Sequence, residues 1–367
     1  MKYYIIAGEA SGDLHASNLM RAIAKLDNSA SFRCWGGDKM EAAGGTLVKH
    51  YRDLAFMGFV EVIANIRTIF KNLKFCKADI LQHQPDVLIL VDYPGFNLRI
   101  AEWGKKNGFK IIYYISPQVW AWKENRVKAI RQYVDQMLVI LPFEADFYKE
   151  RNYAVQYVGH PLVEVIDTFQ PKGNIPVVEK VIAVLPGSRK QEIFIKLPIM
   201  LEVSKRFPNY QFIVAKAPGI DADFYTDILK PYANVSVVEN QTYELLHVAS
   251  AAMVTSGTAT LETALFGVPE VICYKGNALS YHIAKRLIKI KYICLVNLIM
   301  DREVVKELIQ DDLIPDHLEK ELILLLENQA YINRLKADYA ALRTLLAKGG
   351  HASSNAAQAI FTFLNTK

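Results

Sequence analysis

The chain has 367 residues, of which 51% are hydrophobic and 22% charged, a composition typical of a globular protein with large cores and, at this length, of about two domains. Its 43 basic and 38 acidic residues leave a net charge of +5, which does not demand a nucleic-acid partner. The four cysteines are scattered without C-x-x-C spacing, so we expect neither a disulfide framework nor a metal site, and a reducing compartment fits this pattern. We also expect no signal peptide and no membrane-spanning helix, because the apolar runs are too short for either.

The first residues have the pattern of a βα unit. Tyr3–Ala7 predicts a buried strand, Gly8–Asp13 (GEASGD) a tight turn, and Leu14–Leu26 a helix. The turn lacks G-x-G-x-x-G, so it does not indicate a dinucleotide site. Its glycines would let a ligand approach the backbone, although a purely structural turn fits the same residues.

A basic amphipathic segment follows at Phe56–Lys77. Apolar residues at helical spacing lie beside a row of cations, with no acid between Glu61 and Asp79: Phe56, Phe59, Ile63, Ile66, Phe70 and Leu73 are apolar, and Arg67, Lys71, Lys74 and Lys77 are basic. Such a helix suits the surface of an anionic bilayer. The alternative is a core helix with a solvated basic face.

Two further apolar runs predict strands of a parallel sheet. Asp86–Val91 (DVLILV) is continuously apolar after its first residue, and Asp92 follows it directly. Ligands of doubly wound sheets bind beyond the carboxyl ends of the strands, so Asp92 is a candidate site residue, with capping of the next helix as the alternative. Lys110–Ile115 predicts the next strand, and a loop with two tryptophans follows it.

A second α/β series begins after a linker that we place at about 162–179, a stretch that contains two prolines and a glycine. Val181–Leu185 predicts its first strand, and the turn after that strand carries Arg189 and Lys190, which suit phosphate oxygens. Asp221 and Asp223 match the D-x-D metal motif of some sugar transferases only superficially, and we interpret them as helix-capping residues.

The segment Met253–Lys275 combines a strand, a small-residue turn, a helix and another strand. The turn at 255–258 precedes the helix, whose free N–H groups and positive dipole end would suit a phosphate. Glu262 lies one turn into this helix, where a carboxylate could accept hydrogen bonds from ribose hydroxyls. An ordinary βα unit with a Ser/Thr cap fits the same residues.

Seven short motifs occur in order along nearly the whole chain: GEASGD at 8–13, DYPGFN at 92–97, SPQVWAW at 116–122, GHP at 159–161, LPGSR at 185–189, SGTATLE at 256–262 and VPEVICYK at 268–275. No single motif is specific, but the ordered set resembles the lipid-A-disaccharide synthases, a family of B-type inverting glycosyltransferases. The chain departs from the family pattern at Lys306, where a proline is usual.

The resemblance implies an α/β fold with two Rossmann-like domains of the glycosyltransferase B type and a C-terminal helix that returns to the N-terminal domain. We expect an acceptor-side domain with the membrane-facing helix at 1–165, a UDP-sugar-binding domain at 166–348, and the tail helix at 349–367. Gly349-Gly350 would form the hinge before this tail, whose apolar face needs a partner surface.

The resemblance also implies the reaction. It is the transfer of 2,3-diacylglucosamine, with inversion, from UDP-2,3-diacylglucosamine to 2,3-diacylglucosamine 1-phosphate (lipid X), which yields UDP and the β-1,6-linked disaccharide 1-phosphate of lipid A biosynthesis. The implied catalytic base is Asp92, and no metal or cofactor is expected. The other implied site residues are Ser188, Arg189, Ser256, Gly257, Thr258 and Glu262 for UDP, Gly8, Glu9, Ser11, Gly12 and Asp13 on the acceptor side, and Phe56, Phe59, Ile63 and Phe70 at the membrane and acyl chains.

From the same resemblance we expect a cytoplasmic protein, peripheral on the cytoplasmic face of the inner membrane, that forms a homodimer with exchanged tails. Two other functions fit the architecture. A UDP-sugar epimerase would release a free sugar without an acyl acceptor, and a non-catalytic nucleotide-sugar or lipid-binding protein would bind UDP and make no disaccharide. The lipid-linked motif set favours the transferase.

Overall fold

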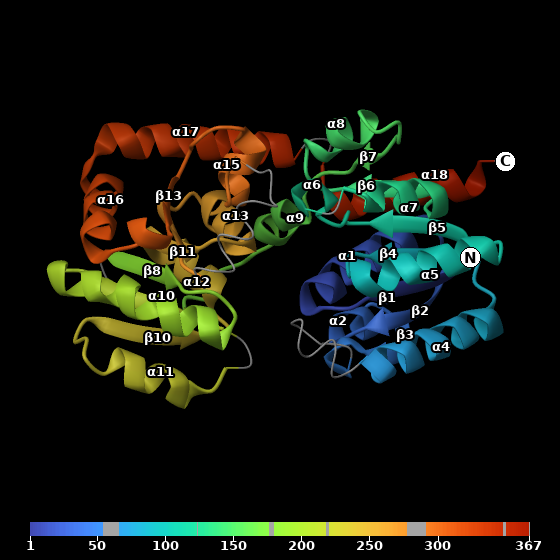
Figure 1. Ribbon diagram of the computed structural model, residues 1–367, viewed down its shortest axis with the longest axis horizontal. Coiled ribbons are helices and arrows are strands. Elements are labelled where there is room, and N and C mark those ends of the chain that lie inside the picture. The colour runs from blue at the N-terminus through green and yellow to red at the C-terminus, as the bar shows by residue number, and fades with distance from the viewer. Residues whose placement is uncertain are drawn as a thin grey trace. The chain divides into compact units, whose positions relative to one another are not determined.

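The computed structural model describes residues 1–53, 66–122, 124–175, 180–217, 220–276, 291–347 and 350–366. The chain forms two compact units. The N-terminal unit consists of Met1–Glu164 together with Leu346–Lys367, and the C-terminal unit of Val165–Leu345. Each unit is a parallel sheet covered by helices (Figure 1), as the sequence predicts.

The sheet of the N-terminal unit has seven parallel strands in the order β3-β2-β1-β4-β5-β6-β7. Its strands are β1 (Lys2–Ala7), β2 (Ser31–Gly36), β3 (Gly45–His50), β4 (Val87–Val91), β5 (Lys110–Tyr114), β6 (Gln136–Val139) and β7 (Gln156–Tyr157). Its helices are α1 (Ala10–Leu26), α2 (Asp38–Ala42), α4 (Ile66–His83), α5 (Pro94–Lys106), α6 (Val119–Trp122), α7 (Arg126–Tyr133), α8 (Glu144–Lys149), α9 (Pro161–Asp167) and α18 (Ala352–Asn365). All five residues of β4 are buried, as the continuous apolar run predicts.

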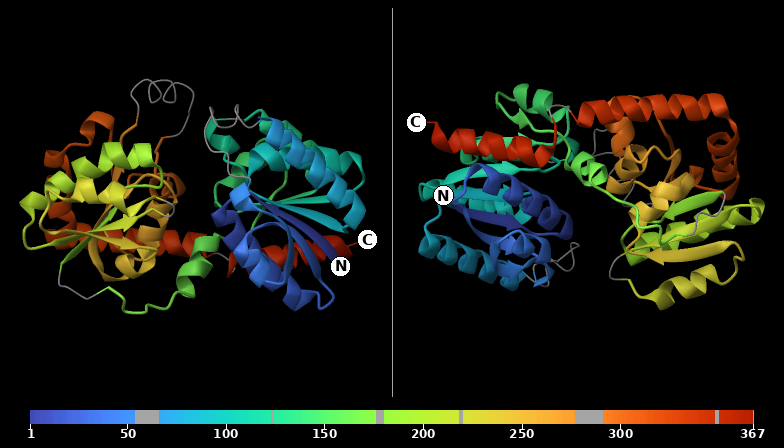
Figure 2. Two further views of the ribbon diagram at one scale, coloured as in Figure 1. Left: turned by 90° about the horizontal axis from the view of Figure 1, so that it is seen from below. Right: turned by 180° about the vertical axis from the view of Figure 1, so that it is seen from behind.

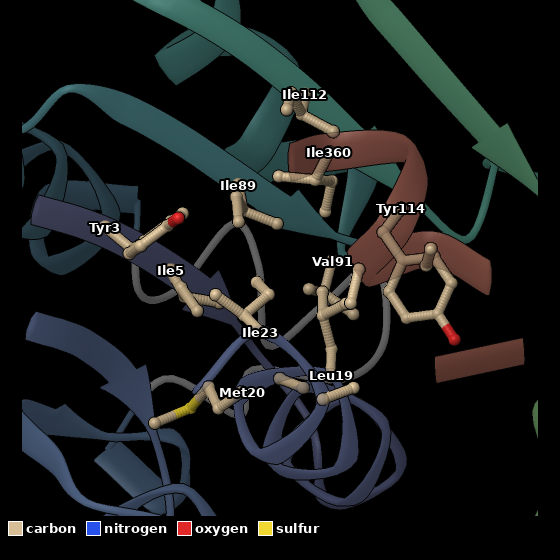
Figure 3. Packing of buried hydrophobic residues seen from close by; sticks show 14 of the residues in the cluster. Tyr3, Ile5, Leu19, Met20, Ile23, Ile89, Val91, Ile112, Tyr114 and Ile360 are labelled. Carbon is tan, nitrogen blue, oxygen red and sulfur yellow. The ribbon is translucent and has the colours of Figure 1, made fainter. Parts of the chain in front are cut away.

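Alternate side chains of the central strands feed two separate cores. On β1, Tyr3 and Ile5 face the core formed with α1 and α18, and Figure 3 shows them against Leu19, Ile23 and Ile360. The intervening side chains, with those of α4, α5 and α7, form the core on the opposite face of the sheet. The sheet of this unit is therefore buried on both faces.

The final helix α18 belongs to the N-terminal unit, which confirms the predicted return of the tail to this unit. It packs on α1, and Ile360 is fully buried there. The hydroxyl of Ser353 donates to Glu164 at 2.6 Å, and the amide of Asn355 donates to the carbonyl oxygen of Val158 at 3.0 Å. These contacts fix the first turn of α18 to the segment that follows β7.

The C-terminal unit repeats the topology with six parallel strands in the order β10-β9-β8-β11-β12-β13. Its strands are β8 (Val181–Leu185), β9 (Gln211–Lys216), β10 (Val235–Glu239), β11 (Ala249–Thr255), β12 (Glu270–Tyr274) and β13 (Lys306–Ile309). Its helices are α10 (Lys190–Glu202), α11 (Ala222–Leu229), α12 (Thr242–Val248), α13 (Thr258–Leu265), α15 (Leu295–Met300), α16 (Pro315–Glu327) and α17 (Gln329–Leu346). Figure 2 shows helices on both faces of each sheet.

Two local expectations were wrong. The predicted tight turn at Gly8–Asp13 is short, because α1 already begins at Ala10. Gly12 lies inside this helix, where a Cβ would be 3.2 Å from the Cβ of Ala7, so its missing side chain lets α1 pack closely on β1. The predicted linker begins with α9, which continues to Asp167.

Two further features of the sequence are the predicted membrane surface and the departure from the family pattern at Lys306. Of the predicted membrane surface, Phe56, Phe59 and Ile63 lie outside the described residues. Lys306, which stands where the family usually has proline, is the first residue of the edge strand β13. Proline is tolerated at such a position, so the departure leaves the sheet intact.

Candidate active site

In each sheet the order in which the chain adds strands reverses at one position, the reversal point. In the N-terminal unit this point lies between β1 and β4, and in the C-terminal unit between β8 and β11. Ligands of doubly wound folds bind beyond the carboxyl ends of the strands at such a point. In the N-terminal unit Glu9 follows β1 and Asp92 follows β4, so the reversal brings two predicted site residues to one sheet edge.

The backbone at Asp92 is held in an uncommon conformation. Asp92 and Tyr93 have φ angles of 45° and 49°, in the left-handed region that residues other than glycine rarely adopt. The carbonyl oxygen of Asp92 accepts hydrogen bonds from the Tyr113 hydroxyl at 2.5 Å and from the Asn97 side-chain amide at 2.8 Å. These bonds offset the strain and fix the direction in which the chain leaves β4.

The Asp92 carboxyl is partly buried, and its proton affinity is altered. Burial raises its pKa to about 6, and the negative charge of Glu9 adds to this effect. The N–H of Tyr93 donates to the carboxylate and opposes the rise. Asp92 therefore titrates within reach of neutral pH, as a group that must accept a proton during a reaction requires.

The GEASGD residues have different environments. Gly8 is covered by the ring of Tyr93, and a Cβ on Gly8 would lie 2.3 Å from a ring carbon, so no larger residue fits. The side chain of Ser11 is exposed, whereas Asp13 is only 2% exposed. The carboxylate of Asp13 accepts hydrogen bonds from the backbone N–H groups of Gly37, Lys39 and Met40 at 2.7–3.1 Å. The structure thus gives Asp13 a positioning role at the N-terminus of α2.

The C-terminal unit has a pocket of about 340 Å³ at its own reversal point. Its wall combines the turn after β8 with the turn after β11: Pro186, Gly187, Ser188, Ser256, Gly257 and Thr258 all line it. Both turns open helices, α10 and α13, whose first N–H groups lack intrahelical acceptors. Two positive dipole ends therefore face one pocket, an arrangement suited to an anion with several oxygens.

Of the other predicted UDP residues, Glu262 lines the pocket and Arg189 does not. The Glu262 carboxylate accepts a hydrogen bond from the Tyr243 hydroxyl at 2.8 Å, and burial raises its pKa. Arg189 is 69% exposed, and its Nη1 is paired with Glu192 at 3.0 Å. The hydroxyl of Ser256 donates to the carbonyl oxygen of Ile293 at 2.8 Å and holds that segment against the turn.

Sequence reasoning missed several residues of this pocket. Lys216 and Ala217 line it at the end of β9, and Thr242 lines it from the start of α12. Tyr243 of the same helix donates the hydrogen bond that fixes Glu262. The strand-end rule that pointed to Asp92 would also have pointed to Lys216, the last residue of β9. Across the described ranges, histidine, cysteine, aspartate and glutamate side chains form no cluster suited to a metal ion.

The sequence matches a family model described as lipid-A-disaccharide synthetase over residues 3–361. The chain belongs to the lipid-A-disaccharide synthase family. It is 39% identical over 357 residues to the lipid-A-disaccharide synthase of Geobacter metallireducens, covering 94% of this chain and 93% of that protein. It is 37% identical to the enzyme of the same name from Syntrophus aciditrophicus, covering 97% and 96%. It is accordingly a glycosyltransferase of lipid A biosynthesis.

Solved structures of similar fold support the same architecture for this synthase family member. A glycosyltransferase of kitacinnamycin is similar with a TM-score of 0.69 at 16% identity, and it covers 99% of both chains. The UDP-GlcNAc 2-epimerase of Neisseria meningitidis, solved with UDP-GlcNAc bound, has a TM-score of 0.67 at 12% identity, again with 99% of both chains covered. At these identities the similarity shows the fold alone, which is the predicted glycosyltransferase B type.

Proposed function

We propose that the protein transfers 2,3-diacylglucosamine from UDP-2,3-diacylglucosamine to the 6-hydroxyl of 2,3-diacylglucosamine 1-phosphate. The products are the β-1,6-linked disaccharide 1-phosphate and UDP, with inversion at the anomeric carbon. The observation that carries this proposal is the chemistry of the two reversal points. One offers a carboxylate of raised pKa, and the other offers a pocket built from two helix N-termini.

Inversion needs a single displacement, and the residues supply its two requirements. Asp92 takes the proton of the acceptor hydroxyl as that oxygen attacks the anomeric carbon. The bond to the diphosphate oxygen breaks, and the N–H groups of the turns at Gly187 and Gly257 stabilise the charge that develops on the leaving UDP. Glu262 would accept hydrogen bonds from the ribose. Proton NMR of the product tests the stereochemistry, because a β linkage is expected and an α linkage would exclude this mechanism.

Arg189→Ala should weaken UDP binding about tenfold, because it removes a charge-assisted contact at the diphosphate. The fold should persist, since the side chain is 69% exposed. Isothermal titration calorimetry with UDP measures the effect. Lys205→Ala is the matched control, because this exposed lysine of the same unit pairs with Glu202 at 2.8 Å and lies over the Tyr232 ring, and it does not line the pocket. Equal UDP affinities of Arg189→Ala and the control would remove Arg189 from the diphosphate site.

We propose that the outer face of α4 lies on the membrane and receives the acyl chains. Phe70 and Phe75 are 58% and 48% exposed there, and the exposed Lys71 and Lys74 stand beside them. The opposite face of α4 is fixed to the protein through Asp79, whose carboxylate accepts hydrogen bonds from Arg33 at 2.6–2.8 Å. Within the described residues no helix is both long and apolar enough to cross a bilayer. The exposed phenylalanines and lysines of α4 fit binding to the surface of the inner membrane, at its cytoplasmic face.

Replacing both Phe70 and Phe75 with serine should release the protein from vesicles that contain anionic lipid. Neither side chain is buried, so the variant should stay folded. Co-sedimentation measures the bound fraction, and Phe194→Ser, at a 66% exposed phenylalanine of the other unit, is the control. Lys71→Gln with Lys74→Gln should make the remaining binding less sensitive to salt. Undiminished sedimentation of the folded double-serine variant would show that α4 does not face the membrane.

We also propose a homodimer that exchanges its tails. Within one chain α18 packs on α1, and exchange would form the same contacts with α1 of a second copy. Gly350, with a φ of 102°, lies just before α18 and permits such a change of direction. Light scattering should give twice the chain mass of 41.5 kDa at micromolar concentration. A monomer would exclude the exchange and leave the enzymatic proposal standing.

A further inference from the structure

Helix α10 buries a lysine and exposes a phenylalanine. Lys196 is only 2% exposed, whereas Phe194 is 66% exposed. The buried side chains of Ile193, Leu197 and Met200 fix which face of the helix meets the sheet, and Lys196 lies on that face. Burying an ammonium group is costly unless a negative charge compensates it. This position therefore calls for an anionic partner.

The ammonium group of Lys196 lies directly behind the wall of the anion pocket. A Cβ on Gly187 would be 3.7 Å from its Nζ, 3.4 Å from Cγ2 of Thr255 and 3.2 Å from Oε2 of Glu192. Gly187, Thr255 and Glu192 all line the pocket. Gly187 has a φ of 108°, a conformation that favours glycine, so at this part of the pocket wall no side chain stands between the backbone and the ammonium.

Glu192 connects this lysine with the predicted phosphate ligand Arg189. One carboxylate oxygen accepts a hydrogen bond from Arg189 at 3.0 Å, and the other lies 3.6 Å from Nζ of Lys196. The second distance is an ion pair longer than a hydrogen bond, so the ammonium retains capacity to donate. Burial lowers the pKa of Lys196, and the charge of Glu192 opposes this effect. Glu192 thus pairs with two cations at the edge of the pocket, and its single negative charge cannot neutralise both.

We propose that Lys196 is a diphosphate-binding residue, which donates a hydrogen bond to a phosphate oxygen placed against Gly187. The diphosphate takes over the role of Glu192 as its counter-charge. This inference rests on the proposed function, because it concerns the UDP of that reaction. A cation held in a poorly solvated position interacts more strongly with phosphate than an exposed one does, so Lys196 also stabilises the charge on the departing UDP.

Lys196→Met tests the proposal, because methionine has a similar length and no charge. Calorimetry should show UDP binding weakened about tenfold or more, while the weak binding of uridine, followed by ligand-observed NMR, should be unchanged. The melting temperature should not fall, because Glu192 is 34% exposed and keeps Arg189 as its partner, so the substitution leaves no buried unpaired charge. Lys205→Met, which removes an exposed lysine of the same unit, should leave UDP binding unchanged.

The outcomes separate this inference from the proposed function. Unchanged UDP affinity of the folded variant, or an equal loss for UDP and uridine, would overturn the role of Lys196. Absence of UDP binding by the unsubstituted protein would overturn the proposed function itself. Should Lys196→Met fail to fold, Lys196→Gln provides the same comparison with a polar side chain, and the same two results overturn the inference.

Discussion

Asp92→Asn should lower the rate of disaccharide formation by about 10²–10⁴-fold, the contribution expected of a positioned general base. Asparagine keeps the size of the side chain but cannot accept the proton of the acceptor hydroxyl. The backbone hydrogen bonds from Tyr113 and Asn97 end on the carbonyl oxygen of residue 92, so they survive the substitution. UDP binding and the melting temperature should therefore stay close to those of the unsubstituted protein.

The pH dependence of the rate provides a second test of Asp92. The base must be unprotonated, and its pKa is raised to about 6, so the rate should fall as the pH drops through about 6. The negative charge of Glu9 contributes to the raised pKa, so Glu9→Gln should move this acid limb to lower pH. If the acid limb of Glu9→Gln stays near pH 6, the charge of Glu9 does not influence the pKa of Asp92. Near-normal turnover of Asp92→Asn would exclude Asp92 as the base.

Glu270→Met should stabilise the C-terminal unit, and more at pH 8 than at pH 5. Glu270 is 1% exposed, and among the described residues neither of its carboxyl oxygens has a hydrogen-bond partner. Burial raises its pKa well above the ordinary value. Below the pKa of the unfolded chain this acid is protonated in both the folded and the unfolded state, so its raised pKa does not lower the stability. As the pH rises above that value, the unfolded chain loses the proton while the folded chain keeps it, and the free energy of unfolding falls.

Removing the unpaired carboxyl of Glu270 should raise the free energy of unfolding by about 1–3 kcal/mol, the cost of burying a polar group without a partner. Urea denaturation at the two pH values measures the free energy of unfolding. Glu327→Met, at the exposed end of α16, is the control and should show little change at either pH. A gain for Glu270→Met that is equal at pH 5 and pH 8 would show that the carboxyl is not protonated in the native state.

Much of the fold follows from local patterns in the sequence. The apolar runs at Val87–Val91 and Val181–Leu185 predict strands buried on both faces, and both are central in their sheets. The small-residue turn at 255–258 predicts a wall of the pocket, and the strand end at Val91 makes Asp92 a candidate site residue. These features can be read from sequence because they depend on neighbouring residues along one element.

The remaining features depend on contacts between distant parts of the chain. The left-handed backbone of Asp92 is held by Tyr113 of β5, and Asp13 accepts its hydrogen bonds from residues more than 20 positions away. The burial of Lys196 is an intermediate case. Its spacing from Ile193 places it on the buried face of α10, but only the packing at Gly187 shows what it faces.

The most direct test of the proposed reaction is to incubate the purified protein with UDP-2,3-diacylglucosamine and 2,3-diacylglucosamine 1-phosphate, and to follow UDP and the lipid products by mass spectrometry. We expect equal amounts of UDP and disaccharide 1-phosphate, formed only when both acylated sugars are present. Release of free sugar from UDP-N-acetylglucosamine without an acyl acceptor would indicate an epimerase. UDP binding without any disaccharide would indicate a binding protein, and either result would contradict the proposed transfer.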